Sequence, residues 1–189
     1  MALVDLIDNS RTDKNTTHSY LDLYETLLSP KKTTAKKVLE IGIDRGGSIK
    51  LWSDYFDNAT IYGFDIIHIN NVWSELKYQT KIVLCTSTDA YGDGFFDTLV
   101  KKNLKFDVMI DDGPHTLESM KYFIVKYSQL LAEDGILIIE DVAEWEWIEV
   151  LKGVVPDNLT PYIETYDLRP NKNRYDDIVF VINRNKIIE

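Results

Sequence analysis

The chain has few of the features that mark several special classes of protein. Cys85 is its single cysteine among 189 residues, which excludes an internal disulfide and a zinc site built from cysteines. No apolar run approaches the length of a transmembrane helix. Residues 1–10 lack the basic flank and long apolar stretch of a signal peptide. We therefore expect a cytoplasmic protein.

Positive charge is also scarce. The 21 Lys and Arg residues are outnumbered by 31 Asp and Glu residues, so the net charge is -10. Contacts to phosphate groups need clustered basic side chains, which a strongly acidic chain does not favour. We therefore expect neither a nucleic acid nor a membrane as partner.

What the chain does contain is typical of one globular domain: 44% of the residues are hydrophobic and 28% are charged. A loose polar arm is expected at 1–13, and apolar spacing predicts a helix over 14–28. Strands are expected at 38–42, 60–65, 81–85, 106–111, 136–140, 162–166 and 177–182, with one helix starting near residue 48 and others near 116–131 and 145–152. This alternation predicts an α/β fold with a mostly parallel sheet. Because no helix is evident between the last two strands, one of them is expected to be antiparallel.

The first predicted strand leads into a glycine-rich turn that runs from Glu40 to Ser48 and includes Gly42 and Gly46. Ligands of open α/β sheets bind at the carboxyl ends of strands, and glycine lets the backbone come close to a ligand. The second strand ends at Asp65, where an acid can accept hydrogen bonds from both hydroxyls of a ribose. The pattern indicates a nucleotide-containing cofactor; a tight turn with a helix cap is the alternative for the glycines alone.

Acidic side chains and a histidine follow two other predicted strands. Asp111, Asp112 and His115 follow the fourth strand, and Glu140 and Asp141 follow the fifth. These strands should be neighbours, about 4.8 Å apart, so their carboxylates converge within reach of one ion. Oxygen ligands suit magnesium, calcium or manganese, and the histidine is then near enough to act as a general base. Taken singly, the same groups could be turn residues, a capping histidine or an exposed strand end.

The stretch 38–142 resembles the class I S-adenosylmethionine-dependent methyltransferases. Val38–Ser48 looks like the first motif of that family, E-x-G-x-x-x-G-G-S, Phe106–Asp111 like its fourth-strand motif, and Leu131–Glu140 like its fifth. The resemblance implies a single Rossmann-like domain. Its mostly parallel seven-stranded sheet would have helices on both faces and one antiparallel strand near the C-terminus.

The resemblance narrows to the sugar O-methyltransferases related to the macrocin and mycinamicin enzymes. The N-terminal signature of that group is matched by Thr12-Asp13-Lys14, His18-Ser19-Tyr20 and Tyr24-Glu25. The group carries D-G-S-H at the position of residues 112–115 and E-D at the position of residues 140–141. It implies magnesium bound by Asp112, Glu140 and Asp141, and His115 and Asp112 as catalytic residues. It also implies S-adenosylmethionine contacts from Lys14, His18, Tyr20, Glu40, Gly42, Gly46, Ser48, Asp65, Ile66, Thr86, Ser87 and Asp111.

The function that this resemblance implies is methylation of a sugar hydroxyl. The acceptor would be rhamnose or a deoxysugar of a glycan or glycosylated metabolite. Residues 1–30 would be an arm and helix that contribute to the site, and residues 31–189 the methyltransferase domain. The aromatic pair Trp145 and Trp147 could form an acceptor wall or the buried face of a helix, and the loop 169–177 could cover the acceptor or be a mobile hairpin loop.

Two other functions remain open from the sequence. An NAD-dependent oxidoreductase could use the same glycine turn and Asp65, although the spacing is not G-x-G-x-x-G. A module that binds the cofactor without turnover could keep the fold. The sequence also leaves open a homodimer and a chain that is one module of a larger glycan-synthesis polypeptide.

Overall fold

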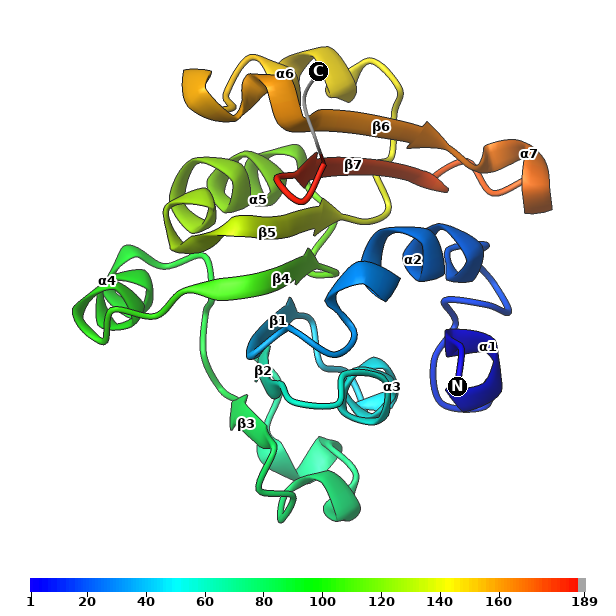
Figure 1. The fold of residues 1–189 in the computed structure, drawn as a ribbon, viewed down its shortest axis with the longest axis vertical. Coiled ribbons are helices and arrows are strands. Elements are labelled where there is room, and N and C mark those ends of the chain that lie inside the picture. Colours follow the sequence, from blue (N-terminus) through cyan, green and yellow to red (C-terminus); the bar gives the residue numbers. More distant parts are fainter. Residues whose placement is uncertain (187–189) are drawn as a thin grey trace.

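A seven-stranded sheet in the order β3-β2-β1-β4-β5-β7-β6 runs through the molecule (Figure 1). The computed structural model describes residues 1–186. The strands are β1 (Lys37–Ile41), β2 (Thr60–Phe64), β3 (Ile82–Cys85), β4 (Phe106–Asp111), β5 (Leu131–Ile139), β6 (Ile163–Asp167) and β7 (Ile178–Asn183). All neighbouring pairs from β3 to β5 are parallel, whereas β7 pairs antiparallel with both β5 and β6. The expectation of one antiparallel strand near the C-terminus is confirmed.

Helices cover both faces of this sheet, as predicted. They are α1 (Leu3–Leu6), α2 (Leu21–Leu28), α3 (Gly47–Tyr55), α4 (Asp93–Lys101), α5 (Leu117–Tyr122), α6 (Trp147–Lys152) and α7 (Arg169–Lys172). Helices α1, α2 and α3 lie on one side of the sheet in Figure 1, and α4 and α5 lie on the other. Each face has its own hydrophobic core, because alternate residues of a strand point to opposite faces. Val38 and Val108 face the α1–α3 side, and Leu39 and Met109 face the α4–α5 side.

This alternation decides where the acidic strand ends point. Ile110 and Ile138 belong to the core on the α1–α3 side, so Asp112 and Glu140, two residues later, turn to that same side. Asp111 turns to the opposite side, toward the core that contains Met109. Because β4 and β5 pair in register from Val108 and Ile136 onward, their ends lie next to each other. The predicted neighbourhood of the two acidic strand ends is confirmed.

The N-terminal region differs from its prediction in two ways. The arm expected to be loose contains α1, and Leu3 is fully buried against the core beneath α3. The helix expected from residue 14 begins only at Leu21, because the backbone N–H groups of Thr16, Thr17 and His18 all turn back to the carbonyl oxygen of Asp13. The predicted start of this helix at residue 14 was therefore wrong, whereas its end at Leu28 was correct.

Three further differences concern later elements. Helix α4 was not predicted, although Phe96 and Leu99 give it a buried stripe. Strand β5 begins at Leu131, five residues before its predicted start, and includes the expected turn at 133–135. A four-residue helix, α7, lies between the last two strands. In residues 1–186, no helix is both long and apolar enough to cross a bilayer.

Candidate active site

A cavity of about 930 Å³ lies at the carboxyl ends of β1, β2 and β4. Of the residues predicted from the sequence, Gly42, Ser48, Asp65, Ile66, Asp112 and His115 line it. Residues that the sequence analysis did not assign also line it, namely 9–13, 16, 41, 43–44, 47, 64, 67, 88–91 and 113–114. The remaining predicted residues do not line the cavity. The cavity is thus where a fold of this type binds its ligand.

The glycine turn is built for close contact with other parts of the chain. Gly42 has a φ of 100°, and a Cβ there would lie 1.9 Å from the carbonyl oxygen of Asp112. A Cβ at Gly46, also at positive φ, would lie 2.2 Å from Leu76 Cδ1. These glycines were expected to let the backbone come close to a ligand; in the structure they make room for neighbouring protein atoms, which shape the cavity wall.

Asp65 lies where the ribose-binding acid was predicted. One carboxylate oxygen accepts hydrogen bonds from the backbone N–H groups of Ile43 and Asp44, at 2.7 and 3.1 Å. The other accepts from the N–H of Ile67 at 3.1 Å. A carboxylate has about four lone-pair sites, so it keeps acceptor capacity for a ligand hydroxyl. Ile66, beside it, is 74% exposed and offers an apolar surface at the cavity.

The loop after β3 contributes different residues from those predicted. Thr86 and Ser87 do not line the cavity, whereas residues 88–91 do. The N–H groups of Ser87 and Thr88 donate to the carbonyl oxygens of Ile67 and Asp65, so the loop is tied to the end of β2. Ser87 has a φ of 51°, which turns the chain toward the cavity at Thr88.

Asp111 lies on the face of the sheet opposite to Asp112. One of its oxygens accepts a hydrogen bond from the hydroxyl of Tyr91, and the other is buried with no hydrogen-bond partner among the described residues. Burial raises the pKa of Asp111 to about 6, and the Tyr91 hydrogen bond offsets part of that rise. Tyr91 itself lines the cavity. The acid is thus one side chain removed from the cavity.

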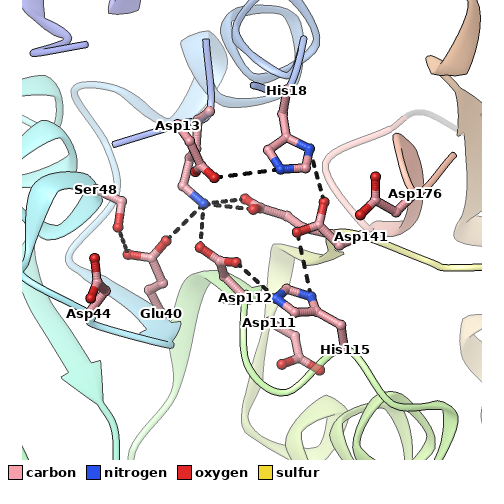
Figure 2. Close-up of polar contacts among 12 residues, drawn as sticks. Asp13, His18, Glu40, Asp44, Ser48, Asp111, Asp112, His115, Asp141 and Asp176 are labelled. Atoms are coloured by element: carbon pink, nitrogen blue, oxygen red, sulfur yellow. Dashed lines mark hydrogen bonds and ion pairs between the residues drawn. The ribbon is translucent and has the colours of Figure 1, made fainter. Parts of the chain in front are cut away.

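A group of three side chains, which we call the outer cluster, lies at the ends of β4 and β5. It consists of Asp112, His115 and Asp141, whose potential ligand atoms all lie within 4.8 Å of one another. His115 lies between the carboxylates, with Nε2 3.7 Å from Asp112 Oδ1 and Nδ1 3.6 Å from Asp141 Oδ2 (Figure 2). His115 and Asp141 both have φ of 53°, a conformation that non-glycine residues adopt rarely and that is concentrated at functional sites.

A second group, the inner cluster, consists of Lys14, Glu40, Asp112 and Glu140. Of these, Lys14, Glu40 and Glu140 are buried. The ammonium of Lys14 lies 2.8 Å from Asp112 Oδ2, 2.7 and 2.6 Å from the two oxygens of Glu140, and 3.3 Å from Glu40 Oε1. Ser48 donates to Glu40 Oε2 at 2.6 Å. Asp112 belongs to both clusters. Lys14, predicted as a cofactor contact, pairs with carboxylates that the sequence assigned to metal and cofactor.

Burial and charge set the pKa values of the inner cluster. Burial would lower the pKa of Lys14, but Asp112 and Glu140 outweigh it and hold that pKa well above its usual value. Burial raises the pKa of Glu40 to about 7, although Lys14 acts in the opposite direction. Burial likewise raises the pKa of Glu140. The lysine charge is therefore firmly retained, while the carboxylates around it are held away from water.

His18 and Tyr20 contact the same acidic strand end from the N-terminal segment. Tyr20 donates its hydroxyl proton to Asp141, and His18 Nδ1 lies 3.2 Å from Asp141 Oδ1. His18 Nδ1 also lies 2.6 Å from an oxygen of Asp177, which is fully buried. Ser19 donates to the other oxygen of Asp177 at 3.0 Å. Neither His18 nor Tyr20 lines the cavity; both hold Asp141 from behind.

The predicted metal ligands do not all meet at one point. Among the described residues, three groups could hold an ion: His18, Asp141 and Asp177; Asp112, His115 and Asp141; Glu40, Asp112 and Glu140. The predicted trio Asp112, Glu140 and Asp141 is not one of them. The outer cluster offers carboxylate oxygens at the cavity and fits a hard divalent ion. The inner group already holds the ammonium of Lys14.

Sequence reasoning missed three side chains that complete the site. Tyr24 donates its hydroxyl proton to Glu140, Asp177 pairs with His18, and Tyr91 donates to Asp111. Tyr24 has helical spacing and belongs to the N-terminal signature, but no role in the site was predicted for it. Asp177 had one signal, since an acid beside the apolar run 178–182 is unusual in a central strand of a sheet.

The residues proposed for the acceptor side lie apart from the cavity. Trp147 packs against the hydrophobic core, which fits the buried-helix alternative for that residue. Trp145 is partly exposed, and the guanidinium of Arg169 lies 5.7 Å from its ring centroid. The loop that carries Arg169 lines a shallow groove of about 450 Å³ with Tyr175.

Comparisons with known proteins place this geometry in context. No family model matches the sequence. The mycinamicin VI 2''-O-methyltransferase of Micromonospora griseorubida is 26% identical over 137 residues, which is 69% of this chain and 33% of that protein. The demethylmacrocin O-methyltransferase of Streptomyces fradiae is 27% identical over 137 residues, again 69% of this chain and 33% of that protein. The matched region thus spans about a third of the curated relatives.

Solved structures agree in fold. MycE methyltransferase from the mycinamycin biosynthetic pathway, solved in complex with Mg and SAH, superposes with a TM-score of 0.75 at 21% identity, covering 97% of this chain and 54% of that one. A fibrillarin pre-rRNA processing protein from Methanococcus jannaschii superposes with a TM-score of 0.61 at 18% identity, covering 82% of this chain and 69% of that one. The chain has the class I methyltransferase fold, and its resemblance in sequence to the sugar O-methyltransferases is confirmed.

Proposed function

We propose that this chain transfers a methyl group from S-adenosylmethionine to a hydroxyl of a sugar, with a divalent ion bound beside the cavity. The observation that carries the proposal is the outer cluster, in which Asp112, His115 and Asp141 meet at the edge of the cavity. The relatives are named as O-methyltransferases, and among their substrates are a rhamnosyl and an olivosyl compound, which favours this function over an NAD-dependent oxidoreductase or a module without turnover. MycE binds Mg and SAH in its solved complex, which supports the same two ligands here.

The cofactor would occupy the cavity. Asp65 would accept hydrogen bonds from the ribose hydroxyls, and Ile66 would pack against the adenine ring. Gly42 and Ser48 would bound the site beneath it. Asp111 would act through Tyr91 on the methionine end of the cofactor, since the Tyr91 hydroxyl donates to it and Tyr91 lines the cavity. Lys14, His18, Tyr20, Glu40 and Gly46 would support these contacts from behind, and Thr86 and Ser87 would fix the loop that bears residues 88–91.

The ion would be held by the carboxylates of Asp112 and Asp141, with Glu140 as the third ligand that the resemblance suggests. When bound, such an ion lowers the pKa of a coordinated hydroxyl. His115 would accept the hydroxyl proton at Nε2, the ring nitrogen nearer to Asp112. The new bond joins the sugar oxygen to the methyl carbon, and the bond from that carbon to sulfur breaks. Its electron pair stays on sulfur, which yields S-adenosylhomocysteine, and the chain supplies orientation and proximity.

Several wider expectations remain part of this proposal. Residues 1–30 would be the arm that completes the site and 31–189 the methyltransferase domain, of which 187–189 lie outside the described residues. The acceptor would be a carbohydrate, in keeping with the rhamnosyl and olivosyl groups in the names of two relatives. A homodimer, and a larger polypeptide of which this chain is one module, are further hypotheses. The proposed location is cytoplasmic.

The test is calorimetric titration of S-adenosylmethionine and S-adenosylhomocysteine, each with magnesium and with EDTA. We expect both ligands to bind the wild type, and magnesium binding to be lost in Asp112→Ala. Asp54→Ala, which removes a half-exposed carboxylate paired with Lys50, should behave as wild type. Failure of both ligands to bind, together with binding of NAD, would refute the methyltransferase proposal.

A further inference from the structure

The two oxygens of Asp141, one of the proposed ion ligands, have different surroundings. Oδ1 accepts a hydrogen bond from the hydroxyl of Tyr20 and lies 3.2 Å from Nδ1 of His18. Oδ2 lies 3.6 Å from Nδ1 of His115 in the outer cluster. Figure 2 shows Asp141 between these two histidines. The N-terminal segment therefore engages one oxygen and leaves the other facing the outer cluster.

The hydroxyl of Tyr20 is the direct hydrogen-bond donor to Asp141. A histidine ring nitrogen carries at most one proton, and Nδ1 of His18 lies closer to Asp177, at 2.6 Å from its Oδ1. The shorter contact indicates that this proton lies between His18 and Asp177. Oδ1 of Asp141 therefore depends on Tyr20 for its hydrogen bond.

The ring of Tyr20 is fixed in its direction. It is fully buried and stacks on the ring of His18, with the centroids 4.9 Å apart and the planes inclined by 17°. The ring of Tyr24 lies 5.9 Å from it. Tyrosine has only two side-chain torsions, so a ring held by packing also fixes where the hydroxyl points.

The backbone that leads to Tyr20 is held as well, although residues 15–19 belong to no helix or strand. The ammonium of Lys172, in α7, donates hydrogen bonds to three carbonyl oxygens of this segment, those of Asn15, Thr16 and His18. Tyr20 is thus kept in position by contacts that do not involve an ion.

The number of oxygens that a carboxylate offers affects which ion it binds. Mg²⁺ requires nearly regular octahedral coordination, whereas Ca²⁺ accepts more oxygen ligands in a flexible geometry and can take both oxygens of one carboxylate. Mn²⁺ also suits octahedral coordination by oxygen. An ion that approached both oxygens of Asp141 would meet the Tyr20 hydroxyl and the His18 ring at Oδ1.

We propose that Tyr20, held by His18, occupies Oδ1 of Asp141 so that Asp141 binds the divalent ion through Oδ2 alone, and that the site thereby favours Mg²⁺ or Mn²⁺ over Ca²⁺. Tyr20 and His18 are then positioning residues, because they act on the ion through Asp141. The inference rests on the proposed function and keeps Asp112, Glu140 and Asp141 as its ligands. It adds a specific role for the contacts behind Asp141.

The experiment measures the affinities for Mn²⁺ and Ca²⁺ on the full chain without acceptor. Free Mn²⁺ is followed by electron paramagnetic resonance, and Ca²⁺ is added as competitor. Tyr20→Phe removes only the hydroxyl and should weaken Mn²⁺ binding by about 10-fold, as the loss of a partner outside the coordination shell does. Ca²⁺ binding should not weaken, because the freed Oδ1 lets Asp141 bind this ion through both oxygens. The preference for Mn²⁺ over Ca²⁺ should therefore fall by at least the same factor.

Tyr55→Phe is the matched control. Tyr55 is also fully buried, and its hydroxyl donates to a carboxylate outside both clusters, that of Glu25, at 3.0 Å. This variant should keep both affinities of the wild type. If Tyr20→Phe does not fold, His18→Asn tests the same contact: it removes the ring on which Tyr20 stacks, keeps an amide donor for Asp177, and should lower the same preference.

The outcomes separate this inference from the function on which it rests. Loss of Mn²⁺ and Ca²⁺ affinity by the same factor in Tyr20→Phe would overturn it, because the hydroxyl would then support the fold without selecting the ion. Unchanged affinities in this variant would overturn it as well, and so would a wild type that binds Ca²⁺ as tightly as Mn²⁺. In these cases the proposed function stands as long as Asp112→Ala abolishes magnesium binding. A wild type that binds neither ion would refute the metal step of the proposed function, and this inference with it.

Discussion

The two halves of the site are built in different ways. The half proposed to bind the cofactor, which we call the cofactor half, lies at the ends of β1 and β2 and consists mainly of backbone groups: the N–H groups of Ile43, Asp44 and Ile67 surround Asp65, and Gly42 makes room for a carbonyl. The half proposed to bind the ion, which we call the ion half, lies at the ends of β4 and β5 and consists of charged side chains. The cofactor half is thus defined mainly by the path of the backbone. The ion half is defined by buried charges, each of which needs a partner of opposite charge.

The two halves also differ in the sequence separation between the residues that contact each other. Ile43 and Asp65 are separated by 22 residues. Lys14 and Glu140 are separated by 126 residues, and His18 and Asp177 by 159. A site made of local turns can form with its own strands, whereas the ion half is complete only when both ends of the chain are in place. The comparison predicts different responses to substitution in the two halves.

The largest expected effect is on the reaction, in the ion half. His115→Asn should lower kcat by about 10²- to 10⁴-fold with any active sugar acceptor, because the base is lost and asparagine tolerates the positive φ. S-adenosylmethionine affinity, a property of the cofactor half, should be unchanged by calorimetry. His68→Asn, at an exposed turn outside the cavity, is the control. A His115→Asn variant with wild-type kcat would remove His115 from its proposed role.

The next largest effect is expected at Gly42, where the two halves of the site are in contact. Gly42→Ala should destabilise the protein by about 3–5 kcal/mol in urea unfolding, since the positive φ and the carbonyl of Asp112 leave no space for a Cβ. Gly94→Ala is the opposite control. It lies exposed in α4 with nothing within 4 Å of an added Cβ, and should stabilise by up to about 1 kcal/mol. Equal effects of the two substitutions would contradict the tight contact.

The same difference between halves explains what the sequence could predict. The strands, the turn at 40–48 and Asp65 follow from short-range patterns: apolar runs, glycine spacing and an acid that ends a strand. The meeting of Asp112 with Glu140 and Asp141 followed from strand adjacency. These features needed no knowledge of side-chain direction beyond the alternation along a strand.

The contacts of residues 14–20 could not be predicted in the same way. Tyr20 and Tyr24 have helical spacing, so local pattern favours a helix over the whole segment. The structure breaks it before Leu21 because Lys14 and His18 bind acids more than 120 residues away, and such tertiary contacts override local propensity. Whether Glu140 faces a metal or a lysine is likewise decided by a partner that no local pattern reveals.

A smaller effect is expected at the contact between His18 and Asp177, which joins the two ends of the chain in the ion half. Asp177→Asn should destabilise the protein by about 2–3 kcal/mol. The two oxygens of the buried carboxylate accept hydrogen bonds from His18 and Ser19, and an amide, which has only one oxygen, can accept only one of these bonds. Asp167→Asn, at a partly exposed pair with Arg169, should change stability by less than about 1 kcal/mol. Urea unfolding of both variants measures the difference. Similar values for the two would mean that the link between the chain ends contributes little.

The smallest effect is expected in the cofactor half, where backbone groups share the binding. Asp65→Asn should weaken S-adenosylmethionine binding by about tenfold, the loss of one charge-assisted hydrogen bond. Asp44→Asn, which also lines the cavity but at an exposed position, should change it by less than about threefold. Calorimetry of both variants shows whether the affinity for S-adenosylmethionine depends on the Asp65 carboxylate as a ribose-binding acid or on negative charge around the cavity in general. Equal losses would show that charge around the cavity, and not the carboxylate at the end of β2, determines affinity.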